Sequence, residues 1–182
     1  MKTLIINGSP RKSGDVSALL AVFENNLKGE IKKFSPFYDD ISPCTDCRYC
    51  RTHTGICGIN DKMQEIYDCT TNFDNIIIAT PVYFLLPTGP LLNVLSRFQV
   101  YFSKGWPSVG KPKKGAVVIT AGGSGGVKET EKVIHTMLRV MNAVSVGTVA
   151  AYNTDKVPAE EDEKALRKAE EIASLLSYEM DR

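Results

Sequence analysis

The chain has 182 residues, of which 43% are hydrophobic and 24% charged, as is usual for a globular protein with a buried core. Its net charge of +1 gives no electrostatic case for nucleic acid or an anionic membrane surface as a partner. No apolar run is long enough to span a bilayer and no secretory signal pattern begins the sequence, so we expect a cytoplasmic protein. In that compartment five cysteines indicate metal, redox or catalytic chemistry before disulfides.

A turn near the start of the chain carries the first functional signal. An apolar strand at residues 4–6 precedes it, and apolar residues at helical spacing follow it over residues 16–27. The turn, residues 8–15, is rich in glycine, hydroxyls and positive charge, and the helix N-terminus directs unpaired N–H groups at it. Its spacing matches neither a Walker loop nor a dinucleotide fingerprint. A phosphomonoester suits the hydroxyl and cationic side chains best, and the alternative is an ordinary polar turn. The candidate ligands are Ser9, Arg11, Ser13 and Ser17.

Strands and helices alternate along the rest of the chain. A weak edge strand is followed by a long aperiodic loop at residues 35–60, and the clearest buried strand is at residues 75–80. This alternation predicts one α/β domain over residues 1–182, with a parallel sheet, helices on both faces and a cysteine-rich insertion at about residues 42–60. The predicted strands are 4–6, 31–34, 75–80, 116–120 and 144–150, and the predicted helices are 16–27, 63–67, 90–98, 133–141 and 165–176. Residues 100–113, which include Trp106, have no regular pattern.

Three unusual loops leave the carboxyl ends of predicted strands, where ligands bind in open parallel sheets. The first is the phosphate turn. The second, residues 81–90, offers Pro81, Val82, Tyr83 and Phe84 to a flat ring, unless this loop packs onto the core. The third, residues 121–126, has Gly122 and Gly123, which let a ligand approach the backbone closely. Phosphate at one end and a planar heterocycle at the other describe a mononucleotide.

Four cysteines lie in the aperiodic loop, and their spacing lets the thiolates converge on one centre. Four thiolates suit a [4Fe–4S] cluster or a structural zinc, and a loop without metal is the third alternative. Cys69 falls on a predicted helix and is interpreted as a packing residue. No Ser–His–Asp or paired-carboxylate arrangement stands out. The four candidate ligands are Cys44, Cys47, Cys50 and Cys57.

The motifs at residues 8–17, 80–84 and 120–123 resemble the flavodoxin-like NAD(P)H-dependent FMN reductases, and the cysteine loop resembles their iron–sulfur flavoprotein branch. The resemblance implies a three-layer flavodoxin-like fold with a five-stranded parallel sheet in the order 2-1-3-4-5. It also implies FMN phosphate on the first turn, the isoalloxazine against the second, and the glycines of the third near the ring. The chain has Asp15-Val16 where the family commonly has Asn-Thr, and Asn93 and Ser96 where it often has Lys and Asp.

We therefore expect an FMN-dependent oxidoreductase that passes electrons from NAD(P)H to a small-molecule or protein acceptor, with a cluster as an intermediate carrier. The flavin performs this chemistry, so no catalytic side chain is named. The alternatives are a flavodoxin-type one-electron carrier, which the near-neutral charge disfavours, and a zinc-stabilised regulatory domain. The resemblance also implies a homodimer or homotetramer, with residues 91–98, Tyr101 and Phe102 as the candidate interface.

Overall fold

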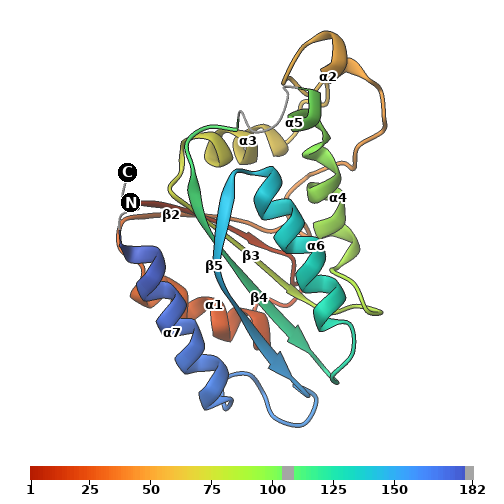
Figure 1. Cartoon of the computed structure of the whole chain (residues 1–182). Coiled ribbons are helices and arrows are strands. Elements are labelled where there is room, and N and C mark those ends of the chain that lie inside the picture. Colours follow the sequence, from red (N-terminus) through yellow and green to blue (C-terminus); the bar gives the residue numbers. More distant parts are fainter. Residues whose placement is uncertain (104–108, 179–182) are drawn as a thin grey trace.

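The computed structural model describes residues 1–103 and 109–178 of the chain, and its centre is a parallel sheet (Figure 1). Five strands pair in the order β2-β1-β3-β4-β5, and all neighbouring strands run parallel. The strands are β1 (Lys2–Asn7), β2 (Glu30–Phe34), β3 (Asn75–Pro81), β4 (Lys113–Ala121) and β5 (Ala143–Tyr152). Both the fold class and the strand order expected from the sequence are confirmed.

The helices cover both faces of the sheet because its central strands are apolar on both sides. Along β3, Ile76 and Ile78 face one hydrophobic cluster and Ile77 faces the other, as the two-residue period of a strand requires. The first cluster is covered by α3 (Met63–Asn72), α4 (Gly89–Arg97) and α6 (Val127–Val140). The second is covered by α1 (Asp15–Asn26) and α7 (Glu163–Ser177), which lie together on the other face in Figure 1.

Two short helices interrupt segments that the sequence pattern left irregular. These are α2 (Tyr49–Thr52) within the cysteine loop and α5 (Gln99–Ser103) directly after α4. Helices of one turn are too short to repeat an apolar stripe, so periodicity cannot reveal them. Two longer helices also extend beyond their predicted bounds: α3 runs on to Asn72, and α6 begins at Val127. Trp106 lies outside the described residues.

No helix in the described ranges combines the length and the apolar composition that crossing a membrane requires.

Candidate functional site

The loops after β1, β3 and β4 meet at the edge of the sheet where the strands end. The backbone N–H of Gly8 donates to the carbonyl of Ala79 at 2.7 Å, which joins the first loop to β3. The Thr88 hydroxyl donates to the Gly8 carbonyl at 2.8 Å and draws the start of α4 to the same place. The N–H of Val82 donates to the Thr120 carbonyl at 2.8 Å, which joins the second loop to the end of β4, directly before the third loop. The convergence expected from the topology is therefore present.

A fourth loop, after β5, completes this edge and was not singled out from the sequence. The N–H of Asn153 donates to the Gly123 carbonyl at 2.8 Å, and that of Thr154 donates to the Ala121 carbonyl at 3.0 Å. The N–H of Ala159 donates to Oδ1 of Asp15 at 2.9 Å, so the loop also reaches the first turn of α1. The available signal was the polar run at residues 153–155 directly after the last strand, where the rule on strand ends places ligand-binding loops.

The four loops enclose a pocket of about 240 Å³. Thr154 and Asp155 of the missed loop also line it. Four other predicted residues lie outside this lining, namely Ser13, Ser17, Phe84 and Gly123. Six of the predicted site residues line the pocket: Ser9, Arg11, Pro81, Val82, Tyr83 and Gly122. The structure therefore brings at least one predicted residue from each of the three loops to a common space.

The turn before α1 forms one end of this pocket. Ser9 is 5% exposed, and its Oγ accepts a hydrogen bond from the Arg11 N–H at 3.2 Å. Ser17 supports the turn, because its hydroxyl donates to the Arg11 carbonyl at 3.2 Å, whereas Ser13 is exposed. Asp15 lies in the first turn of α1, the position that favours a carboxylate. The N–H groups of this first turn have no partners within the helix and are available to an anion.

The second loop presents a protruding apolar turn. The N–H of Tyr83 donates to the Leu86 carbonyl at 2.9 Å, and the N–H of Leu86 returns a bond to the Tyr83 carbonyl at 3.2 Å. The two residues between them have left-handed backbones, with φ of 46° at Phe84 and 70° at Leu85. Phe84 is 98% exposed, so its side chain is not packed onto the core. This turn is free to contact a flat ring or another molecule at the pocket mouth.

The third loop needs glycine at defined positions. A Cβ built on Gly122 would lie 2.5 Å from Oδ2 of Asp155, so a side chain here would displace that carboxylate. At Gly126, φ is +77° and a Cβ would lie 2.4 Å from the Cα of Leu85, so the second and third loops can pack closely here. Gly123 differs, because no heavy atom of the described residues lies within 4 Å of its Cβ position.

The four cysteines of the loop line a second cavity, of about 300 Å³. Three arginines, Arg48, Arg51 and Arg97, also line it. All five cysteines lie in the described part of the chain, and each is a free thiol. Within residues 1–103 and 109–178 no three His, Cys, Asp or Glu side chains already converge as metal ligands. The donor set nevertheless fits a cluster: four thiols are the full ligand complement of a cubane, and they surround one space.

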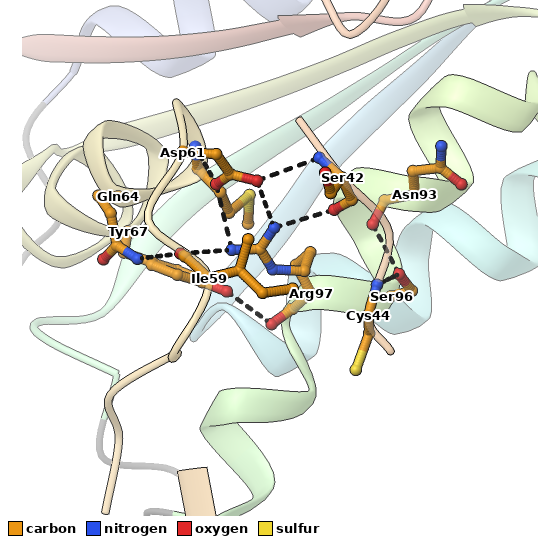
Figure 2. Close-up of polar contacts among 10 residues, drawn as sticks. Ser42, Cys44, Ile59, Asp61, Gln64, Tyr67, Asn93, Ser96 and Arg97 are labelled. Carbon is orange, nitrogen blue, oxygen red and sulfur yellow. Dashed lines mark hydrogen bonds and ion pairs between the residues drawn. The ribbon is translucent and has the colours of Figure 1, made fainter. Parts of the chain in front are cut away.

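Arg97, at the end of α4, ties both flanks of the cysteine segment together (Figure 2). Its guanidinium forms a buried, two-pronged ion pair with Asp61, with distances of 2.6 Å from Nη1 and 3.1 Å from Nη2. Nη1 also donates to the Ser42 carbonyl at 2.9 Å, and Nη2 donates to the Ile59 carbonyl at 3.2 Å. The segment between residues 42 and 59 is therefore closed at its base by one side chain.

Ser96 makes a second attachment between α4 and the cysteine loop. Its Oγ accepts a hydrogen bond from the Cys44 N–H at 3.1 Å and donates to the Asn93 carbonyl at 2.7 Å (Figure 2). From the other side, the hydroxyl of Tyr67 on α3 donates to the Arg97 carbonyl at 2.8 Å. Ser96, where the family often has another residue, thus positions the first cysteine of the motif.

The Arg97–Asp61 pair is charged in the folded protein. Burial acts to raise the pKa of Asp61, but hydrogen bonds from Arg97 and from the N–H groups of Ser42 and Met63 outweigh it and hold the pKa below 3.8. Burial acts to lower the pKa of Arg97, and the bond to Asp61 together with the nearby Tyr67 and Cys57 raises it above its usual value. The cavity wall therefore carries a guanidinium whose charge is held beside the Asp61 carboxylate.

The two pockets lie at opposite ends of α4. Its N-terminus follows Thr88, which is bound to the phosphate turn, and its last residue is Arg97 in the wall of the cysteine cavity. Of the described residues, none lines both pockets. Nine residues at a rise of 1.5 Å correspond to about 13 Å of helix between the two places.

One part of the expected subunit interface is wrong. Tyr101 is 4% exposed and packs in the core of its own chain, against Tyr67 and Phe98, so it is not available to a second subunit. On α4, Leu91, Val94 and Leu95 are likewise buried against the sheet. Phe102 is 57% exposed and lies beside the cysteine cavity. Apolar residues at helical spacing indicate a buried face. The spacing alone does not distinguish the core of the same chain from a subunit interface.

The sheet order, the helix layers and a pocket built by the loops at the strand ends define a flavodoxin-like protein. Solved structures with this fold include an FMN-dependent NADH-azoreductase from Bacillus anthracis in complex with FMN, which has a TM-score of 0.69 and 17% identity over 98% of this chain and 100% of that one. A flavodoxin from the domain Archaea has a TM-score of 0.56 and 16% identity, with 98% of this chain and 100% of that chain covered.

The sequence comparisons define the family more closely. The profile of the NADPH-dependent FMN reductases matches residues 1–156. An iron–sulfur flavoprotein of Methanosarcina thermophila is 30% identical over 182 residues, which is 97% of this chain and 93% of the relative. One from Methanocaldococcus jannaschii is 30% identical, with 92% of this chain and 90% of the relative covered. The chain belongs to the NADPH-dependent FMN reductase family, in its iron–sulfur flavoprotein branch.

Proposed function

We propose that this chain is an FMN-dependent oxidoreductase that passes electrons from NAD(P)H to an acceptor, with a [4Fe–4S] cluster in the cysteine loop as an intermediate carrier. The observation that supports it most is the convergence of a phosphate-binding turn, an apolar turn and a glycine turn on one pocket. A separate cavity lined by four free thiols supports the second redox centre. The names of the relatives, iron–sulfur flavoproteins, agree with both parts.

The roles of the pocket residues follow from their positions. Ser9 and Arg11, with the first N–H groups of α1, bind the phosphate, and Ser17 holds the turn through the Arg11 carbonyl. Residues 81–83 lie along the ring, Phe84 stands at the mouth of the pocket, and Gly122 lets the backbone approach the ring. When bound, the flavin supplies the exchange between two-electron hydride chemistry and one-electron transfer. The protein binds this group, orients it and excludes water from its face.

The cysteine loop is assigned to one-electron transfer. Cys44, Cys47, Cys50 and Cys57 are the proposed ligands, and α4 holds their segment through Arg97 and Ser96. Four thiolates in one cavity also suit zinc, so metal identity is a separate outcome of the test.

A homodimer or homotetramer is proposed on the exposure of the apolar turn. Tyr83, Phe84, Leu85 and Leu86 are 47%, 98%, 55% and 45% exposed at the mouth of the flavin pocket. A second copy that covers this turn would bury it together with the ring and exclude water from both. Sedimentation velocity of the flavin-loaded protein tests the assembly: a monomer at micromolar concentration would contradict it.

The test of the function is anaerobic purification followed by a visible spectrum, flavin and metal analysis, and steady-state oxidation of NADH and NADPH. We expect one FMN and about four irons per chain and turnover with an artificial acceptor. Flavin without NAD(P)H oxidation would favour the flavodoxin-type carrier instead. One zinc with no iron would overturn the cluster, and one zinc with no flavin would support a zinc-stabilised regulatory domain.

A further inference from the structure

Arg97 has one donor that its known contacts leave unused. Nη1 and Nη2 are occupied by Asp61 and by the carbonyls of Ser42 and Ile59. Its Nε–H is buried and has no hydrogen-bond partner among the described residues. A buried donor left unsatisfied costs about 1–3 kcal/mol, so native proteins rarely keep one without a partner. The side chain is 0% exposed, so solvent does not supply that partner.

The position of Arg97 indicates what the missing partner is. The residue lines the cavity that Cys44, Cys47, Cys50 and Cys57 surround. Cys57, the last cysteine of the motif, lines the same cavity as Arg97. The only anion bound to the guanidinium within the described residues is Asp61, and it accepts from Nη1 and Nη2. Sulfur in the cavity is therefore the acceptor that matches both the position and the charge of the free donor.

We infer that the Arg97 Nε–H donates to a sulfur of the cluster or of its cysteine ligands, and that this bond raises the reduction potential of the cluster. This inference rests on the proposed function of the cysteine loop. Reduction adds one negative charge to an already anionic centre, and a fixed cation with an aligned N–H stabilises the reduced state more than the oxidised state. Arg97 is a positioning residue as well, because the same guanidinium fixes residues 42 and 59 on either side of the ligands.

The primary variant is Arg97→Lys, which keeps the positive charge beside Asp61 but removes the Nε–H. The readout is the midpoint potential of the cluster in a mediated redox titration followed by EPR, with iron content as a check of occupancy. We expect iron to be retained and the ratio of reduced to oxidised cluster at a fixed potential to fall about tenfold. This corresponds to a midpoint potential lower by about 59 mV for a one-electron couple. Arg51→Lys is the matched control, because Arg51 lines the same cavity but is exposed, and its potential should equal that of the wild type.

A second measurement uses unaltered protein and does not depend on the variant folding. Protein labelled with ¹⁵N at arginine Nε is reduced and studied by pulsed EPR. We expect a weak ¹⁵N coupling to the cluster that is kept in Arg51→Lys. If no such coupling is found, or if Arg97→Lys retains iron with an unchanged potential, the inference is wrong. If the wild type binds no iron after anaerobic reconstitution, the proposed cluster itself is wrong. The iron content of the wild type is therefore measured before any variant is compared.

Discussion

Two adjacent glycines in the third loop differ in the space that a side chain would find. At Gly122 a Cβ would lie 2.5 Å from the Asp155 carboxylate, whereas at Gly123 no described heavy atom lies within 4 Å. In Gly122→Ala the Asp155 carboxylate, which lines the pocket, must turn away from the third loop, and we expect FMN affinity to fall about tenfold, or about 1.4 kcal/mol. Fluorescence titration with FMN measures this effect. Gly123→Ala is the control, and equal losses in both variants would contradict the assignment.

Arg11 and Ser13 also come from one motif but differ in position. Arg11 lines the candidate flavin pocket and Ser13 does not, although both residues are exposed. Arg11→Ala should weaken FMN binding about 10- to 100-fold, since a hydrogen bond to a charged group contributes roughly 1.5–3 kcal/mol. Ser13→Ala should change it by much less. Isothermal calorimetry with FMN and with riboflavin, which lacks the phosphate, provides the measurement: an equal effect of Arg11→Ala on both ligands would place the anion elsewhere.

These residues also show that a sequence motif does not give the direction of its side chains. The hydroxyls of the first turn cannot be distinguished from the sequence. In the structure, Ser9 faces the pocket, Ser17 bonds to a backbone carbonyl and Ser13 is exposed. A motif gives the type and spacing of residues, whereas the direction of each side chain depends on the turn conformation. Asp155 shows the converse, because it lines the pocket although it lies outside the three loop motifs.

At the scale of elements, a buried lysine joins three segments at the start of β4. The Lys113 ammonium is 0% exposed and donates to the carbonyls of Val109 and Lys111 at 2.8 Å and of Met141, at the end of α6, at 3.1 Å. Burial, with a smaller effect of the Lys111 charge, lowers the pKa of Lys113 to about 8. All three donors of the ammonium are used, so the charge is tolerated but costs stability.

This lysine predicts a rise in stability at alkaline pH. Below about pH 8 the group is charged in both the folded and the unfolded chain, and the desolvation cost is fully present. Between about 8 and 10.5 the unfolded chain keeps a proton that the folded chain has lost, so the free energy of unfolding increases with pH. Relative to Lys113→Met, the wild type should gain about 2 kcal/mol between pH 7.5 and 9.5, as measured by urea unfolding. Parallel pH profiles of the two proteins would contradict the prediction.

The helices and strands were predictable where their buried residues form a regular apolar pattern in the sequence. The central strand β3 is buried along six of its seven residues, and its apolar run is visible in the sequence. The one-turn helices α2 and α5 were not predictable, because each is fixed by its neighbours rather than by a repeat of its own. The apolar residues of α4 were expected to contribute to a subunit interface, and the packing shows instead that they lie against the sheet of the same chain.

At the scale of the whole molecule, the two candidate redox sites are structurally separate. They lie at the two ends of α4, and none of the described residues lines both. Replacing Cys44, Cys47, Cys50 and Cys57 by serine should therefore abolish iron binding but change FMN affinity by no more than about twofold. Flavin titration and iron analysis of the quadruple variant test this, with far-ultraviolet circular dichroism to show that the fold is kept. A large loss of FMN affinity would mean that the sites are coupled.

The sequence by itself determined the order of strands and helices, the parallel sheet and the loops at its carboxyl edge, because apolar periodicity and the topology of alternating elements are local or nearly local properties. It also determined the four-thiol composition of the cysteine loop. Only the tertiary structure decided which hydroxyls face the pocket, that the loop after β5 closes it, and that Arg97 and Asp61 join the base of the cysteine loop. These contacts link residues far apart in the chain, and their hydrogen-bond geometry depends on packing that no local pattern records.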